Sequence, residues 1–358
     1  MAFEIGKTTA GYEVLEVLGS SKTGVAYKVR NVFAQRFEVL KILPKNLQDN
    51  EEQVARFLRE IKVHARLVHP HIVTFYNARE IEGQLVMTTE YVPGFTVADC
   101  LEKGLIPRKE AVTYACHALS ALECAHANGI VHRGLTPSNL VVTGEGIVRL
   151  SGFGLAKASS DPQLTAVGTV VGALRYISPE QVKGENNVDG RADIYALGVI
   201  LYEMLTGKRP FDAKGQFETM LAHVNTPPKN PSDLNPQLPR ELSEVVLRSL
   251  AKDPDQRYQT AAEFRGALER ENDGMVVPSV AVAAAASNGA AQPAVDSVHS
   301  IPRQQPGQPL PAAAFSGDVA TFLQQKLFSR LGISLAAGAI TFLLGSAALL
   351  ALLALTKP

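Results

Sequence analysis

The sequence lacks a net charge, because its 358 residues include 35 Lys and Arg against 35 Asp and Glu. A chain without excess positive charge has no general attraction to nucleic acid, and no cluster of Lys and Arg forms a basic stripe here. We therefore expect no nucleic-acid partner.

Cysteine is also scarce, with only Cys100, Cys116 and Cys124. Their odd number, their apolar helical surroundings and the absence of paired C-x-x-C spacing speak against a disulfide framework or a zinc site. Buried, reduced thiols are the simpler interpretation and indicate a reducing cytosol. The first eleven residues show no signal peptide.

Charged residues are missing altogether from one long segment near the C-terminus. Leu331–Leu355 contains none, is bounded by Arg330 and Lys357, and exceeds the roughly 20 apolar residues that span a bilayer. We predict a transmembrane helix at 331–355. A buried core helix is the alternative, but the segment follows a linker and has no other domain to bury it.

The residues on either side of this span suggest how it is used. Gly274–Gly317 is rich in Ala, Pro, Ser and Gln and predicts a flexible linker, followed by a juxtamembrane segment at 318–330. Three residues follow the span, so we predict a tail-anchored, single-pass membrane protein. Lys326 and Arg330 precede it against one lysine after it, which favours a cytoplasmic N-terminal domain.

Small residues recur within the predicted span. Ala337, Thr341 and Gly345 are spaced every four residues, so they share one helix face where a second helix could approach closely. This pattern suggests a homodimer. The alternative is that small residues are simply common in such helices.

The folded part begins with strand patterns. Tyr12–Gly19 and Val25–Arg30 alternate apolar and polar residues and predict a hairpin. Its turn, from Gly19 to Gly24, keeps two glycines of a G-x-G-x-x-G loop and has Ser21 in the place of the middle glycine. Such turns join many hairpins, so the turn alone is weak evidence for a nucleotide site.

The next two elements each carry one charged residue of interest. Phe37–Leu43 predicts a third strand and contains Lys41, and Glu51–Leu67 predicts a helix that contains Glu60.

With further motifs downstream, these residues resemble a bacterial-style Ser/Thr protein kinase domain over about Tyr12 to Leu268. The landmarks, in family order and spacing, are Lys41, Glu60, His132-Arg133, Pro137-Ser138-Asn139, Phe153-Gly154, Ser178-Pro179-Glu180, Asp193 and Arg257. The resemblance implies an α+β, two-lobed fold at 12–270, with an antiparallel sheet and one helix in the N-lobe and a mainly helical C-lobe. Nucleotide would lie between the lobes.

Four positions depart from the family pattern. The resemblance implies that Gly134 replaces the Asp that accepts the substrate's proton, and that Thr136 replaces the Lys that balances charge on the transferred phosphate. Gly152 replaces the acid that holds magnesium, and Ala173 replaces a Thr that hydrogen-bonds the missing Asp and Lys. We therefore predict that no catalytic residue is intact.

Magnesium binding is expected to be weak or absent, because the retained candidate ligand, Asn139, is a neutral amide. Magnesium prefers carboxylate and phosphate oxygens. We predict no other metal.

ATP binding stays open at this stage. Lys41 and Glu60 could hold a nucleotide, with or without metal, or could form a bridge that only braces the helix against the sheet. Ala26 and Val39 exchange the sizes of the family's two roof residues, which would conserve the volume of a shared apolar pocket. The implied nucleotide-contacting positions are Gly19, Gly24, Ala26, Val39, Lys41, Glu60, Thr89, Glu90, Val92, Asn139 and Val141.

Three further positions are implied to be structural. Glu180 and Arg257 match a buried ion pair, and Asp193 is predicted to cap backbone amides at the start of a central helix. The activation segment, Lys157–Tyr176, contains Ser159, Ser160, Thr165 and Thr169. Arg133 could pair with a phosphate there or simply brace the loop, and we favour the brace.

The resulting prediction is a membrane-tethered pseudokinase that acts as a signalling scaffold or allosteric binding module. Protein partners, including an active kinase, are expected. The alternative is an enzyme, either a divergent active Ser/Thr kinase or a nucleotidyl transferase that uses ATP. The missing acids at positions 134 and 152 favour the first hypothesis.

Overall fold

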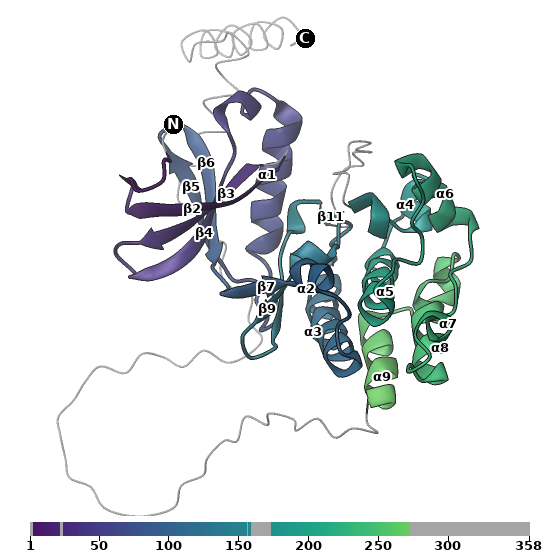
Figure 1. Cartoon of the computed structure of the whole chain (residues 1–358). Coiled ribbons are helices and arrows are strands. Elements are labelled where there is room, and N and C mark those ends of the chain that lie inside the picture. Colours follow the sequence, from purple (N-terminus) through teal and green to yellow (C-terminus); the bar gives the residue numbers. More distant parts are fainter. Residues whose placement is uncertain (1–2, 22–23, 156, 159–172, 273–358) are drawn as a thin grey trace, which may run out of the picture. The chain divides into compact units, whose positions relative to one another are not determined.

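The computed structural model describes residues 3–21, 24–155, 157–158 and 173–272 (Figure 1). They form two lobes, one with an antiparallel sheet and one mainly helical, as predicted. The predicted linker, juxtamembrane segment and transmembrane helix lie outside the described residues. Within those residues, no helix combines the length and apolar character needed to cross a membrane.

The N-terminal sheet has six strands in the order β1-β2-β3-β4-β6-β5, and every neighbouring pair is antiparallel. Its strands are β1 (Thr8–Thr9), β2 (Tyr12–Ser21), β3 (Gly24–Asn31), β4 (Arg36–Ile42), β5 (Phe75–Ile81) and β6 (Gln84–Glu90). Residues with alternating burial, such as Tyr27, Val29, Leu40 and Ile42, form the small core of this lobe. The predicted hairpin and third strand are therefore confirmed.

Helix α1 (Glu51–His64) is the single long helix described in the N-lobe (Figure 1). Asn50 begins it, since its side chain accepts a hydrogen bond from the amide of Gln53 at 3.1 Å. The helix buries Phe57 and Ile61 on the face that also carries Glu60. It ends three residues before the predicted Leu67.

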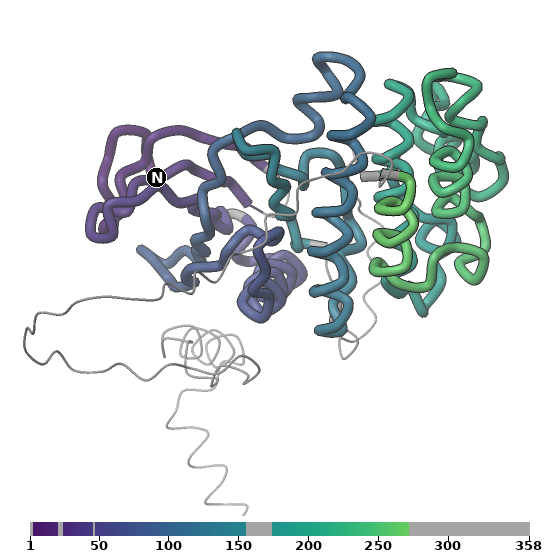
Figure 2. The backbone as a smooth tube through the Cα atoms, turned by 90° about the horizontal axis from the view of Figure 1, so that it is seen from below, coloured from purple at the N-terminus to yellow at the C-terminus, as the bar shows by residue number. Residues whose placement is uncertain are grey.

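The C-lobe is organised around α3 (Arg108–Ala127) and α5 (Arg191–Thr206), whose apolar residues fill its core. Figure 2 shows α9 (Ala261–Asn272), in the lightest green, alongside α3. The remaining helices are α2 (Val97–Lys103), α4 (Pro179–Val182), α6 (Gln216–Asn225), α7 (Pro231–Leu234) and α8 (Arg240–Ser249).

Short strands and 3-10 turns near the lobe boundary position the site. The strands form two small sheets, β10 (Val148–Leu150) with β9 (Leu140–Thr143) and β7 (Gly94–Thr96), and β11 (Lys157–Ala158) with β8 (Ile130–Val131). The 3-10 turns are η1 (Lys45–Leu47), η2 (Pro137–Asn139), η3 (Phe153–Leu155), η4 (Ala173–Tyr176) and η5 (Pro254–Gln256). A parallel bridge between Ile72 and Leu150 ties the segment before β5 to β10.

The three cysteines are free thiols, as predicted, but they are partly rather than fully buried. They pack against the C-lobe core, and burial raises the pKa of Cys116 to about 12. These thiols are poor nucleophiles at neutral pH.

Candidate functional site

The ion pair between Lys41 on β4 and Glu60 on α1 is formed. Lys41 Nζ lies 2.8 Å from Glu60 Oε1 and 2.7 Å from Oε2. The side chains are 19% and 6% exposed, so the pair is largely shielded from water. It fixes α1 against the sheet, which both the nucleotide and the brace hypotheses require.

A buried cluster of tilted rings connects α1 to the segments that lack the two acids. Phe153 lies 5.5 Å from His64 and 4.9 Å from His132, measured between ring centroids. His64 Nε2 bonds the carbonyl of Val73 at 2.7 Å, and His132 Nε2 bonds that of Ser151 at 3.0 Å. Burial lowers the pKa of both histidines, so we treat the rings as neutral at pH 7.

His64 was not identified from the sequence. It lies four residues after Glu60, on the same helix face, and this spacing is the signal that could have revealed it. The ion pair thus holds α1 against the sheet within the N-lobe, and the ring cluster joins α1 to the segments at residues 132 and 153.

Asp193 does not have the predicted capping role. It lies in the first turn of α5, but Gly190 begins that helix without a side-chain cap. The Asp193 carboxylate instead accepts hydrogen bonds from the amides of His132 at 2.9 Å and Arg133 at 2.8 Å. It also lies 2.8 Å from Nε2 of His126. Asp193 therefore fixes a distant loop rather than its own helix.

Arg133 braces the same loop. Its φ is +63°, its Nη2 donates to the carbonyl of Val188 at 2.8 Å, and its own carbonyl accepts from Gln181 Nε2 at 2.9 Å. These contacts support the brace hypothesis. The four candidate phosphorylation positions, Ser159, Ser160, Thr165 and Thr169, lie outside the described residues.

Thr136 and Asn139 bond to each other within the degenerate loop. Asn139 Oδ1 accepts from both the amide of Thr136, at 2.9 Å, and its hydroxyl, at 2.8 Å. The amide of Asn139 donates back to the Thr136 carbonyl at 3.0 Å. The side-chain oxygen of Asn139 that a metal would need is thus already bonded twice by Thr136, which lies two residues after Gly134.

Gly152 is packed against the same asparagine. Its φ is +86°, which favours glycine, and a Cβ added there would lie 2.0 Å from Asn139 Nδ2. Asn139 therefore occupies space that a side chain at position 152 would need. The backbone of Ala173 lies in η4, and its side chain is outside the described part of the chain.

These residues do not fit magnesium. Gly134 and Gly152 supply no carboxylate, and the Asn139 carbonyl oxygen is engaged by Thr136. Among the described residues, no group of three or more His, Cys, Asp or Glu side chains could hold a metal ion. The missing acids and the bonded oxygen of Asn139 therefore both argue against a metal at this position.

The predicted roof residues share the sheet face of Lys41. Ala26 is directly opposite Lys41, and Val39 precedes Lys41 by two residues and is opposite Thr89. Gly19 is opposite Ala26 in the next strand. The exchange of sizes between Ala26 and Val39 therefore occurs on one surface.

Gly24 has a structural reason to be glycine. Its φ is +150°, and a Cβ there would lie 2.5 Å from the carbonyl oxygen of Ile42. The close approach of β3 to β4 requires it, so its retention is no evidence for phosphate binding.

The hinge positions lie at the end of β6 and just after it. Thr89 is buried, while Glu90 Oε2 accepts from the amide of Thr74 at 3.1 Å and from its hydroxyl at 2.9 Å. The Glu90 side chain is therefore a brace. Val92 is partly buried after it, and Val141 is partly buried in β9.

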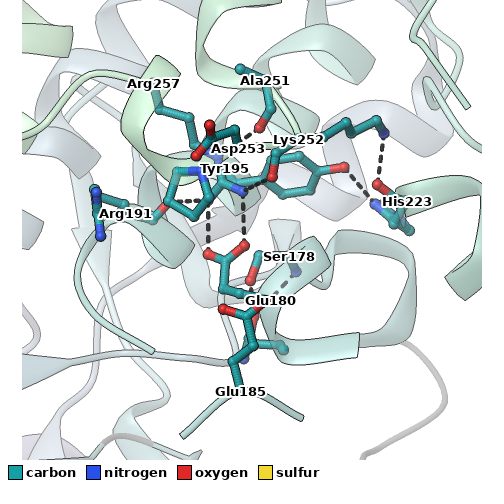
Figure 3. A network of polar contacts seen from close by, with 12 residues as sticks. Ser178, Glu180, Glu185, Arg191, Tyr195, His223, Ala251, Lys252, Asp253 and Arg257 are labelled. Atoms are coloured by element: carbon teal, nitrogen blue, oxygen red, sulfur yellow. Dashed lines mark hydrogen bonds and ion pairs between the residues drawn. The ribbon is translucent and has the colours of Figure 1, made fainter. Parts of the chain in front are cut away.

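The predicted ion pair below the site is present and almost fully buried (Figure 3). Arg257 Nη1 and Nη2 each lie 2.8 Å from one Glu180 carboxylate oxygen, and the two side chains are 0% and 5% exposed. Arg257 also donates to the carbonyls of Ala251, Arg191 and Lys252. All five N–H groups of the guanidinium thus have an acceptor, which fits a structural role.

Residues 12–266 match the model of the protein kinase domain family. A probable serine/threonine-protein kinase of Clostridium perfringens is 37% identical over 268 residues, covering 74% of this chain and 39% of the relative. The serine/threonine-protein kinase PknB of Mycobacterium tuberculosis is 37% identical over 270 residues, covering 74% of this chain and 43% of the relative. This chain thus matches less than half of the length of either relative.

Solved structures give the same result. The crystal structure of the Mycobacterium tuberculosis PknI kinase domain is similar with a TM-score of 0.58 and 32% sequence identity, covering 76% of this chain and 100% of that chain.

Proposed function

Because this chain belongs to the protein kinase family, we propose that it is a pseudokinase that serves as a binding or scaffolding module in signalling. The observation that carries the proposal is the bonding and packing of the Asn139 side chain. Its carbonyl oxygen is bonded to Thr136, and its amide nitrogen fills the space beside Gly152.

The chemistry of phosphoryl transfer explains why the missing acids and the bonded Asn139 oxygen should prevent catalysis. A kinase relies on positioning and on charge near the transferred phosphate rather than on covalent steps. Loss of the general base at position 134 alone costs about 100- to 10,000-fold in rate, and loss of the metal ligand at position 152 adds a further penalty. The residues present here support no metal-dependent transfer step.

The preserved parts support a binding role. The Lys41–Glu60 pair holds α1 on the sheet, and the Phe153 ring cluster joins α1 to the C-terminal segments, without the catalytic acids. We propose that the sheet face shared by Lys41, Ala26 and Val39 holds ATP, and that the domain binds protein partners. We propose that these partners include an active kinase.

Transfer of labelled phosphate from ATP to a general protein substrate is expected to stay at background with magnesium. Lys41→Ala should leave that background unchanged, because the signal does not come from this site. Gly134→Asp combined with Gly152→Asp should restore little activity, since Asn139 obstructs the new side chain and Thr136 remains. Magnesium-dependent transfer that Lys41→Ala abolishes would instead identify a divergent kinase, or a nucleotidyl transferase if the nucleotide is the transferred group.

We further propose that residues 331–355 anchor the domain to the cytoplasmic face of a membrane. The full chain should sediment with membranes after carbonate washing, whereas a chain ending at residue 272 should remain in the supernatant. Replacing Leu343 and Leu344 by arginine should also release the full chain, because each central charge costs about 2.5–3.5 kcal/mol on insertion. Retention of both variants in the membrane fraction would contradict an anchor at 331–355.

A further inference from the structure

We infer that Asn139 has changed from a metal ligand into a hydrogen-bond donor to phosphate, so that this domain binds ATP free of magnesium. The inference rests on the proposed retention of nucleotide. It specifies the form of the ligand and the atom that selects it.

The orientation of the Asn139 carboxamide follows from its partner. The backbone amide of Thr136 can only donate, so the Asn139 atom 2.9 Å away must be the oxygen. The nitrogen therefore points to the opposite side. No described group accepts a hydrogen bond from Nδ2, and Nδ2 is not among the buried side-chain atoms without a partner. Nδ2 is therefore not fully buried, and among the described residues it has no acceptor of its own.

The Asn139 nitrogen lies beside a segment that Glu60, the partner of Lys41, also approaches. Nδ2 lies 2.0 Å from the Cβ position of residue 152, where the family has its metal-binding acid. Glu60, which holds Lys41, comes within 2.9 Å of the Cβ position of Gly154. The side chains of Asn139 and of Glu60, the partner of Lys41, therefore both lie against the short segment of residues 152–154.

The charges around this segment favour an anion over a hydrated cation. The acids at 134 and 152 are gone, and Glu60 is engaged by Lys41. An N–H donor to a phosphate oxygen forms a charge-assisted hydrogen bond, whereas the same N–H cannot coordinate magnesium. Magnesium bound to ATP would occupy phosphate oxygens that the amide could otherwise bond, without gaining a protein ligand.

Rotating the carboxamide would not easily rescue metal binding. A flipped Asn139 would direct Nδ2 at the amide of Thr136, so two donors would face each other and the bond at 2.9 Å would be lost. The hydroxyl of Thr136, which now donates to Oδ1 at 2.8 Å, would have to reorient as well. The bonds to Thr136 thus hold the Nδ2 donor of Asn139 on the side away from Thr136.

The test is calorimetric titration of the full-length chain with ATP, in EDTA and in saturating magnesium, for wild type and Asn139→Asp. Aspartate keeps an oxygen for both Thr136 bonds and changes only the outward atom, from a donor to a negatively charged acceptor. Wild type should bind ATP in EDTA at least as tightly as with magnesium. Asn139→Asp should bind ATP about tenfold or more weakly in EDTA, and magnesium should restore its affinity.

Two controls test whether the weaker ATP binding of Asn139→Asp arises at the phosphates and at position 139. Adenosine, which has no phosphate, should bind wild type and Asn139→Asp equally. Asn77→Asp makes the same charge change at an exposed asparagine whose side chain accepts the amide of Ala78, and it should leave ATP binding unchanged.

The inference is wrong if magnesium tightens ATP binding to wild type about tenfold or more. It is equally wrong if Asn139→Asp binds metal-free ATP like wild type, or if wild type binds no ATP in either condition. These titrations measure ATP binding and not phosphate transfer. A failure of this inference is therefore distinct from a failure of the proposed pseudokinase function, which the transfer assay tests.

Discussion

Glu180→Ala should lower the free energy of unfolding by about 3–5 kcal/mol, because it leaves the Arg257 guanidinium buried without its counter-charge. The arginine side chain is 0% exposed, so water cannot replace the lost carboxylate. Domains of this kind are stable by only about 5–15 kcal/mol, so the change removes a large part of the total. Urea unfolding followed by circular dichroism measures the loss.

The exposed pair of Arg240 and Glu244 on α8 provides the matched control. Its atoms lie 3.1 Å apart and its side chains are 83% and 64% exposed, so Glu244→Ala should change stability by no more than about 0.5 kcal/mol. Glu180→Gln can still accept a hydrogen bond from the guanidinium, so its loss of stability should lie between those of Glu180→Ala and Glu244→Ala. If Glu180→Ala behaves like Glu244→Ala, the ion pair does not stabilise the C-lobe as we propose.

The second large effect is expected at Asp193. The amides of His132 and Arg133 bond different oxygens of Asp193, and asparagine has one neutral oxygen, so Asp193→Asn should leave one amide without an acceptor and the other with an uncharged one. We expect a loss of about 2–4 kcal/mol at neutral pH, since hydrogen bonds to charged groups contribute about 1.5–3 kcal/mol each. The loop that carries Gly134 and Thr136 should loosen, which faster amide hydrogen exchange there would show.

This effect should depend on pH in a defined direction. Burial alone would raise the pKa of Asp193, but the hydrogen bond and charge of His126, with the amide of His132, hold the pKa below its ordinary value. A carboxylate with a lowered folded-state pKa stabilises fully above its unfolded pKa of about 3.9, and this stability is lost as the pH falls through the folded pKa.

The difference between wild type and Asp193→Asn should therefore shrink as the pH falls below about 4. Asp212, which pairs with Arg209 at 2.9 Å and is 56% exposed, provides the comparison, and Asp212→Asn should have little effect at any pH. A difference for Asp193→Asn that stays constant down to about pH 2 would mean that the charge of Asp193 is not responsible.

Local patterns in the sequence were sufficient for the first elements of the N-lobe, whereas the two-lobed arrangement was expected from the family resemblance. Alternation over Tyr12–Gly19 and Val25–Arg30 identified the hairpin, and the apolar stripe around Glu60 identified α1, because both patterns depend on neighbours within one element. The Glu180–Arg257 pair was predicted from motif order alone. Its many partners, drawn in Figure 3, come from several segments and were not predicted.

The errors have a common physical origin. Asp193 was expected to cap its own helix, yet its carboxylate bonds the amides of residues 132 and 133, about 60 positions away. His64 was overlooked because its role requires Phe153 from another part of the chain. Such contacts depend on how elements pack, and no short window of sequence contains both partners.

The sequence by itself determined which chemical groups this protein has lost. Residues 134 and 152 are glycine, so neither can supply a carboxylate in any conformation. Only the tertiary structure decided what the remaining group does, because the orientation of the Asn139 amide depends on hydrogen bonds with Thr136 and on the space left beside Gly152. A residue type limits the available donors and acceptors, whereas packing decides which of them faces the ligand.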